Sequence, residues 1–238
     1  MSKIVGIGAN VHDTLITINT YPEEDKKFPC QSVKECGGGP CATALTTAAT
    51  LGAECAYIGA LACDASGKFL YADLEKFGVS TECVDRVEGA SSFASYILLS
   101  LENASRTCVF NKQNLPKFEL DNKKQEAIKN AKILLIDGNE MENAIKGAVL
   151  AKKSGTKVLY DAGGLYEGIE NLLPYSDILI PSEEFSLGAT GAKCAEDADV
   201  KNANGVIALL EGNNAEAAKL FKAAGNAAAK ENLAVIDV

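Results

Sequence analysis

Apolar residues recur along the chain in short continuous runs that alternate with segments of helical spacing. The continuous runs are typical of strands buried on both faces, and they predict strands at residues 3–8, 56–60, 133–136, 158–160 and 178–180. Helical spacing, with glycine after several of the ends, predicts helices at residues 41–51, 67–77, 121–130, 142–153 and from 182 onward. From residue 56 onward strand and helix alternate. This order predicts a mostly parallel sheet with helices on both faces, a three-layer α/β/α fold.

Two segments interrupt this alternation because polar residues are mixed into their apolar runs. Residues 14–18 predict a half-exposed strand, and residues 91–101 and 106–110 predict a hairpin closed by Glu102-Asn103-Ala104-Ser105. We expect these pieces to pair into a small antiparallel sheet that stands off the main one. This β lid would comprise about residues 13–36 and 90–110 of a single α/β domain spanning residues 1–238, in which an alanine-rich stretch at 213–230 predicts a further helix.

Composition narrows the function classes. Of the 238 residues 47% are hydrophobic and 23% are charged, as in a folded globular protein. The formal net charge of −9, without a basic run, argues against binding to nucleic-acid backbones, whose affinity comes from Lys and Arg. No apolar run approaches the roughly 18 residues that a membrane span needs, and no charged start leads into one. We therefore expect no nucleic-acid partner, no membrane partner and no secretory signal.

The cysteines and the single histidine limit the chemistry further. Eight cysteines are present, but no pair is spaced C-x-x-C, and the only histidine is His12. Zinc sites usually need such pairs, so we assign no metal ligand and expect reduced thiols in a cytoplasmic protein. A catalytic Ser-His-Asp or Cys-His pair would have to use His12, which lies in a predicted strand and is expected to be packed or solvated. Catalysis would then use carboxylates, backbone amides and a bound metal.

Gly6-Ile7-Gly8 is a partial match to the dinucleotide fingerprint G-x-G-x-x-G. That motif opens a helix, but here Val11 stands at the third glycine position and a strand is predicted to follow. A nicotinamide-dependent dehydrogenase is therefore a weak alternative. The phosphate loop G-x-x-x-x-G-K-[ST] does not occur in the sequence.

Gly37, Gly38 and Gly39 precede a helix of small residues and form the strongest candidate site. Glycines let the backbone approach a ligand closely, and the start of a helix offers free N–H groups. Asp13 and Asp25 lie in the two segments before this loop, and carboxylates beside backbone amides suit the hydroxyls of a polyol. The alternative is a structural glycine turn with two solvated aspartates.

A series of short motifs extends this site along the chain. In order they are Gly8 with Asp13, Tyr21-Pro22-Glu23-Glu24-Asp25, Gly38-Gly39-Pro40-Cys41-Ala42-Thr43-Ala44 running on to Gly52, Asp64-Ala65-Ser66-Gly67 with Phe77-Gly78-Val79, Arg106-Thr107, Asp161, and Pro181-Ser182-Glu183-Glu184-Phe185 with Thr190-Gly191. Together they resemble the ribokinase-like carbohydrate kinases of the PfkB type, most closely the ketohexokinase branch. The resemblance covers residues 2 to about 191.

The resemblance implies a ribokinase-like fold and ATP-dependent phosphorylation of a sugar or related polyol by direct transfer, with Mg²⁺ bridging the nucleotide phosphates. It implies substrate contacts from Asp13, Asp25, Gly38, Gly39 and Thr43, with Arg106 reaching the substrate from the lid. Glu183 and Glu184 would lie at the nucleotide cofactor. In such kinases the lids often pair between subunits, which implies a homodimer.

Several departures from the family pattern stand beside these matches. Thr43 replaces an asparagine, Pro40 replaces a polar residue, and Ser182 and Phe185 stand at the ends of the family's N-x-x-E motif. The second family signature, D-T-x-G-A-G-D, which would carry the catalytic base, does not occur. We assign no catalytic residue, and we do not give that role to Asp137, Asp161 or Asp237.

The family pattern resumes at Gly205, and about 50–60 residues of it have no counterpart between about 191 and 205. We expect that segment to belong to a longer protein, in preference to a true deletion. The alternative function is a catalytically inactive sugar- or nucleoside-binding remnant of a carbohydrate kinase.

Overall fold

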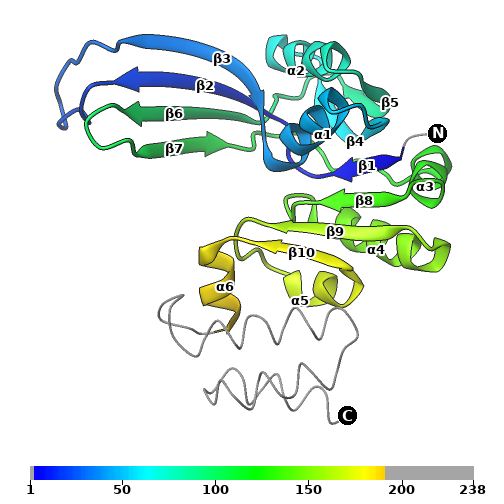
Figure 1. Ribbon diagram of the computed structural model, residues 1–238. Helices are drawn as coiled ribbons and strands as arrows, with labels where there is room; N and C mark the ends of the chain where they lie inside the picture. Colours follow the sequence, from blue (N-terminus) through cyan, green and yellow to red (C-terminus); the bar gives the residue numbers. More distant parts are fainter. Residues whose placement is uncertain (1–2, 191–238) are drawn as a thin grey trace. The chain divides into compact units, whose positions relative to one another are not determined.

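The computed structural model describes residues 3–190, which form two compact units (Figure 1). The units are Met1–Glu119 and Leu120–Val238. The helix expected at 213–230 and the segment between 191 and 205 lie outside the described residues. Each unit is described by itself.

The first unit contains three parallel strands in the order β1 (Ile4–Ile7), β4 (Cys55–Ala62) and β5 (Val79–Val87). Helices α1 (Pro40–Thr50) and α2 (Ala65–Lys76) pack on them. Every residue of β4 is buried, as its continuous apolar run predicts. Close approach of α1 requires Gly6, because a Cβ there would lie 2.6 Å from the Cys41 sulfur.

A second, four-stranded sheet belongs to the same unit. Its order is β3 (Ser32–Gly38), β2 (Val11–Ile18), β6 (Ala94–Ser100) and β7 (Arg106–Asn111). The hairpin β6–β7 is antiparallel as expected, but β2 and β6 run parallel, so the expected antiparallel pairing of these two strands is wrong. The reason is that both strands begin at the same end of the sheet, where the N–H of His12 donates to the carbonyl of Phe93.

The starts of β2 and β6 are both fixed to the first turn of α2. Before β6, the Ser92 hydroxyl and N–H both donate to the Asp64 carboxylate, at 2.6 and 2.8 Å, and Asp64 also caps α2 by accepting from the Gly67 N–H. At the start of β2, His12 Nδ1 lies 2.7 Å from the Ser66 hydroxyl, and its ring packs on Phe69 at 4.6 Å. His12 is therefore a packed residue, as the sequence predicts.

The second unit alternates helix and strand. Its elements are α3 (Asn122–Lys129), β8 (Ile133–Ile136), α4 (Met141–Ser154), β9 (Lys157–Ala162), α5 (Ile169–Leu172) with a 3₁₀ turn (Leu173–Tyr175), β10 (Ile178–Pro181) and α6 (Glu183–Thr190). β8, β9 and β10 are parallel neighbours in that order. The carboxylate of Asp177 holds the start of β9 by accepting from the Val158 N–H at 2.8 Å.

The predicted parallel strands and their helices are thus confirmed in both units, with a second sheet in the first unit. Within residues 3–190 no helix is long and apolar enough to cross a membrane.

Candidate functional site

Asp13 is the centre of the candidate site in the first unit. It lies on β2, and its Oδ1 accepts a 2.6 Å hydrogen bond from the hydroxyl of Ser95 on β6. Burial raises the pKa of the Asp13 carboxyl, while the bond from Ser95 and the nearby His12 act in the opposite direction. Ser95 is itself only 3% exposed, so one oxygen of Asp13 is held from inside the protein.

The other carboxylate oxygen, Oδ2, lies against the backbone of Gly38. A Cβ on Gly38 would overlap that oxygen, so only glycine leaves room for Asp13 in this position. Gly39 follows with φ +88°, and a Cβ there would lie 2.5 Å from the Ala9 carbonyl oxygen. Both glycines are therefore required by close packing within the protein, and the approach of a ligand to this loop stays a prediction.

The start of α1 donates its N–H groups within the protein. Pro40 has no N–H, Ala42 donates to the Ala9 carbonyl at 3.2 Å, and Thr43 donates to the Gly39 carbonyl at 3.0 Å. The free N–H groups expected at this helix start are not found at these positions. Two polar side chains stand at this site, namely the Asp13 carboxylate and Thr43, which is exposed in the first turn of α1.

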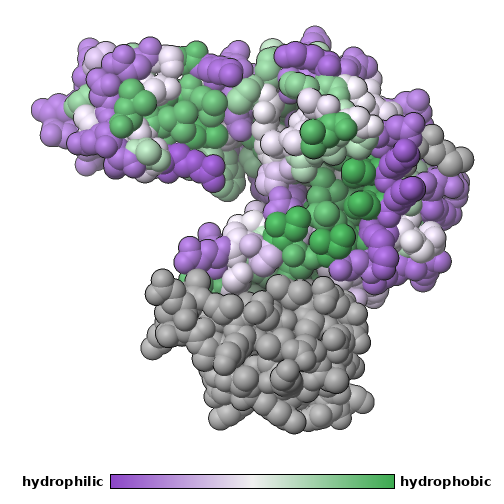
Figure 2. Space-filling view, in the orientation of Figure 1, coloured by the Kyte–Doolittle hydropathy of each residue, from purple (hydrophilic) through white to green (hydrophobic). Residues whose placement is uncertain are grey.

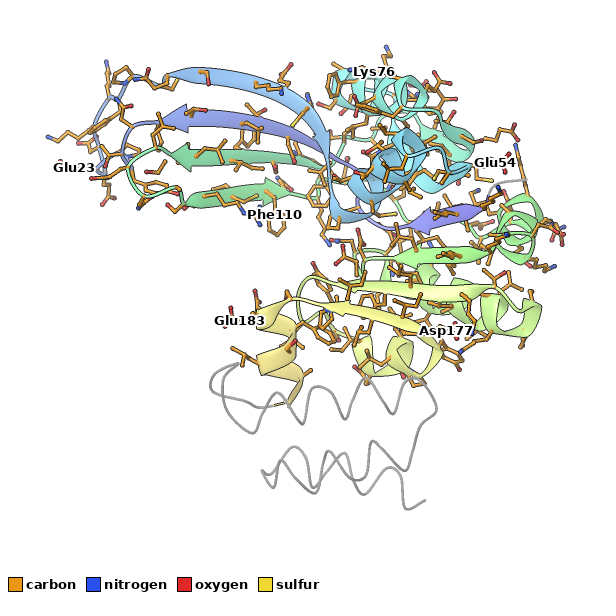
Figure 3. The ribbon with its side chains drawn as sticks, in the orientation of Figure 1. Glu23, Glu54, Lys76, Phe110, Asp177 and Glu183 are labelled. Atoms are coloured by element: carbon orange, nitrogen blue, oxygen red, sulfur yellow. The ribbon has the colours of Figure 1, made fainter. Side chains whose placement is uncertain are left out.

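Two of the expected substrate residues lie at the other end of the four-stranded sheet. Asp25 is exposed in the loop after β2, with φ 59°, at the end marked by Glu23 in Figure 3. Arg106 begins β7 and pairs with Leu99, whose partner on β2 is Thr17, four residues beyond Asp13. The structure thus brings together Asp13, Gly38, Gly39 and Thr43, and it separates them from Asp25 and Arg106.

Sequence reasoning missed Ser95, because a single serine in an apolar strand carries no motif. It also missed Cys36, the register partner of Asp13 on β3. Burial, followed by the charge of Asp13, raises the pKa of the Cys36 thiol. Register between neighbouring strands is the signal that finds both residues, and it exists only once the pairing of β2 is known.

In the second unit, Ser182 accounts for one departure from the family pattern. Its hydroxyl accepts from the Phe185 N–H at 3.0 Å and donates to the Gly163 carbonyl at 3.1 Å. The serine therefore caps α6 and joins it to the segment after β9. Glu183 and Glu184 follow in the first turn of α6, and both are exposed.

Asp137 and Asp161 lie at the carboxyl ends of β8 and β9, where the sequence predicts them. Asp137 is 1% exposed, and its Oδ1 accepts from the Asn139 N–H at 2.9 Å. Burial and then the charge of Asp137 raise the pKa of Asp161. Burial, with Tyr166 and these two carboxylates, raises the pKa of Tyr160 to about 12. The electrostatic potential at the carboxyl ends of β8 and β9 is therefore negative. Across residues 3–190 no group of three or more His, Cys, Asp or Glu could hold a metal ion.

The segment after Gly8 also decides the dinucleotide alternative. It forms strand β2, whereas the dinucleotide fingerprint requires a helix there. Instead, the parallel strands with their helices and the second, mixed sheet match the ribokinase-like α/β fold of solved structures. A model of the pfkB family carbohydrate kinases matches residues 1–214, and the chain belongs to that family. The resemblance inferred from the motifs is confirmed.

Two curated relatives place the chain within the family. Ketohexokinase of Mus musculus is 28% identical over 144 residues, which cover 60% of this chain and 48% of the relative. Ribokinase of Haemophilus influenzae is 23% identical over 206 residues, which cover 84% of this chain and 66% of the relative. The matched region thus spans about half to two thirds of the length of these relatives.

Solved structures show the same fold. A ribokinase of Arabidopsis thaliana, described as complexed with ribose and ATP, is 18% identical with a TM-score of 0.67, covering 100% of this chain and 99% of that one. A ribokinase of Giardia lamblia is 16% identical with a TM-score of 0.76, covering 90% of this chain and 68% of that one. At these identities the likeness concerns the fold.

Proposed function

We propose that this protein phosphorylates a sugar or related polyol by direct transfer from ATP. The observation that carries the proposal is the Asp13 carboxylate, held by Ser95 on one oxygen and seated on the backbone of Gly38 with the other. The chain belongs to a family of carbohydrate kinases. A carboxylate fixed beside the glycine loop that leads into α1 can accept a hydrogen bond from a sugar hydroxyl.

Each side chain of the site has one task in this proposal. Asp13 accepts a hydrogen bond from a sugar hydroxyl through Oδ2, because Oδ1 already accepts from Ser95. Thr43 offers a hydroxyl from the exposed first turn of α1. Gly38 and Gly39 carry no side chain, so that the sugar can approach the backbone there. Asp25 and Arg106 lie at the other end of the sheet of the same chain, and their contacts with substrate stay predictions.

We propose ATP as the phosphoryl donor on the basis of family membership alone. Mg²⁺ bound to nucleotide phosphates usually takes only one or two protein carboxylates. Glu183 and Glu184, exposed in the first turn of α6, are the carboxylates that we propose for it. We assign no catalytic base, because D-T-x-G-A-G-D does not occur in the sequence.

A coupled ADP-release assay on a panel of sugars tests this function. Turnover at even about 0.1 per second, slow for an enzyme, supports the kinase and excludes the binding remnant. The intact mass of the same preparation is compared with the 25.0 kDa of this chain, so that a longer protein is recognised. No turnover from a protein of that mass, together with measurable sugar binding, would establish the binding remnant instead.

The other face of the four-stranded sheet supports a homodimer as part of the proposal. Val33, Tyr96 and Val109 lie on the face opposite Asp13, by register, and are 60%, 55% and 62% exposed. Figure 2 shows hydrophobic residues on the four-stranded sheet. Because apolar side chains on an open sheet are typical of association surfaces, we propose that a second copy covers this outer face (Val33, Tyr96 and Val109).

We also propose that the protein is cytoplasmic and that residues 1–238 act as one domain. None of the seven cysteines in the described part forms a disulfide, and thiols persist in reducing compartments. Mass spectrometry after alkylation in denaturant without reductant tests the redox state, since all eight cysteines are then expected to carry the label.

A further inference from the structure

His12 joins the four-stranded sheet to helix α2. It lies in β2, but its Nδ1 is 2.7 Å from the hydroxyl of Ser66 in the first turn of α2, and its ring packs on Phe69 with the centroids 4.6 Å apart. α2 contacts β2 at this end of the sheet (Figure 1). The imidazole is therefore a contact through which a change in charge can act on the sheet and the helix together.

The other ring nitrogen of His12, Nε2, is buried and makes no hydrogen bond within residues 3–190. A neutral imidazole has one donor and one acceptor nitrogen. Whichever of these roles Nδ1 takes toward Ser66, the remaining role at Nε2 is left unsatisfied. Because an unsatisfied buried polar group costs free energy, the ring is incompletely bonded as it stands.

Glu35 of β3 is the group nearest to hand that can complete the bonding of a charged ring. It pairs in register with Thr14, two residues beyond His12, so the side chains of Glu35 and His12 share one face of the sheet. The Glu35 Oε1 lies 4.0 Å from the His12 Nε2, and the glutamate side chain is 63% exposed. A rotation of this exposed side chain that brings the two atoms to about 2.8 Å would form a charge-assisted hydrogen bond, which is roughly twice as strong as a neutral one.

Further carboxylates surround the ring. Asp13 follows His12 in β2, and Asp64 caps α2; burial is the largest influence on the pKa of each, and the charge of His12 acts to lower both pKa values. Asp73 of α2 lies against the glycine that pairs with His12 on β3, whereas the partner on β6 is the uncharged Ala94. Histidine is the side chain whose charge ordinarily changes between pH 5 and 8, and these carboxylates favour its charged form.

We infer that His12 is a pH-operated latch between α2 and the four-stranded sheet. When the ring is charged, Nδ1–H donates to Ser66 of α2 and Nε2–H pairs with Glu35 of β3; when the ring is neutral, it loses the ion pair with Glu35. β3 runs on from Glu35 to Gly38, where the Asp13 carboxylate is seated, so the latch steadies the strand beside the candidate site. Because the ion pair favours the charged ring in the folded protein, its stabilisation is present at pH 6 and is lost as the pH rises toward 8. The inference requires no bound sugar, so it stands or falls separately from the proposed function.

The first test follows the imidazole by proton NMR on the untagged full chain. Because His12 is the only histidine in the sequence, its ring C–H signals are identified without further assignment. Glu35→Gln keeps the size of the side chain and removes its charge, so the midpoint of the imidazole titration should fall by roughly half a pH unit. Glu54→Gln is the matched control, because Glu54 is exposed and its carbonyl binds the start of β1, whereas His12 follows the end of that strand. The control should leave the midpoint unchanged, and equal midpoints in the unaltered protein and Glu35→Gln would overturn the latch.

Hydrogen exchange then tests whether the ion pair steadies the sheet. It is measured by mass spectrometry on the amides of β2 and of the first turn of α2, whose sequences are the same in all three proteins. At pH 6 the unaltered protein and Glu54→Gln should be protected roughly threefold more than Glu35→Gln, which is the half unit of pH expressed as a ratio. At pH 8 the three proteins should be equally protected. Equal protection at pH 6 as well would overturn the latch even where the midpoint had moved.

Discussion

The carboxylate of Asp13 occupies the space in which a side chain on Gly38 would begin. The two residues lie on neighbouring strands β2 and β3, which pair antiparallel with Val11 opposite Gly38. Gly38 is therefore needed for the position of Asp13, and the glycine-rich loop and the aspartate form one structural unit. Substitution at either position should change sugar binding before it changes folding.

Gly38→Ala is expected to abolish or strongly weaken sugar binding. The new methyl group displaces the Asp13 carboxylate, which must then rotate away from Ser95. A loss of tenfold or more in affinity, about 1.4 kcal/mol, should appear in a titration with the best sugar of the panel. The free energy of unfolding should fall by no more than the cost of one lost buried hydrogen bond, about 1–3 kcal/mol, because only the Asp13 side chain is displaced.

Gly163→Ala is the control for that substitution. Nothing lies within 4 Å of a Cβ built there, and its backbone is not in the left-handed region. Gly163→Ala should therefore bind sugar as the unaltered protein does. Unchanged affinity in both variants would mean that the sugar does not contact Asp13.

Asp13→Asn should remove sugar binding while the fold persists. The amide keeps the shape of the carboxylate and can still accept from Ser95, but it presents an N–H₂ group where Oδ2 accepted. Burial raises the pKa of Asp13 in the folded state, so its ionisation lowers stability as the pH rises through that pKa. At pH 7 the neutral variant should be at least as stable as the unaltered protein. A clear fall in melting temperature would make Asp13 a structural residue.

The sequence predicts the elements whose burial is uniform. β4 is buried along its whole length and β8 nearly so, and their positions match the apolar runs, whereas α4 is buried on one face only and matches the helical spacing. The apolar pattern does not predict β3, because four of its seven residues are exposed and two more are only half-buried. It does not predict β5 either, because one of its three buried positions is the polar Thr81 and five of its nine residues are polar.

The residues of the candidate site also differ in how far the sequence predicts them. Asp13, Gly38 and Gly39 are recognisable in sequence because each belongs to a motif. Ser95 is not, since its contact with Asp13 joins positions 82 residues apart through a parallel pairing that local pattern does not encode. The separation of Asp25 from Asp13 has the same origin, because the length and register of β2 decide it.

Tyr96→Lys should dissociate the proposed dimer. Tyr96 is 55% exposed on the outer face and pairs with Val109 across β6 and β7. A charge there must be desolvated if a second copy covers the sheet, which disfavours association. Sedimentation velocity should show a dimer for the unaltered protein and a monomer for the variant. Glu82→Lys, exposed on β5, is the control and should leave the dimer intact. A monomeric unaltered protein would contradict the dimer.

Asp64→Ala tests whether the first turn of α2 positions the four-stranded sheet. Asp64 caps α2 through the Gly67 N–H and accepts two hydrogen bonds from Ser92, just before β6 begins. Loss of the cap alone should cost about 1 kcal/mol of unfolding free energy in urea. Sugar affinity should fall as well, because the loosened β6 carries Ser95, the partner of Asp13.

The pH dependence and a second cap make that test specific. Burial acts to raise the pKa of Asp64, but the hydrogen bonds from Ser92 and Gly67 outweigh it and lower the pKa below 3.8. The unfolded chain therefore takes up this proton first, so the stabilisation is present above about pH 4 and is lost as the pH falls below the folded pKa. The stability difference between the unaltered protein and Asp64→Ala should shrink accordingly between pH 7 and pH 3. Asp121→Ala removes the corresponding cap of α3, where Asp121 accepts from the Lys124 N–H, and should leave sugar affinity unchanged. Equal loss of sugar affinity in both variants would show a general effect of destabilisation, whereas loss in Asp64→Ala alone establishes the link from α2 through β6 to Asp13.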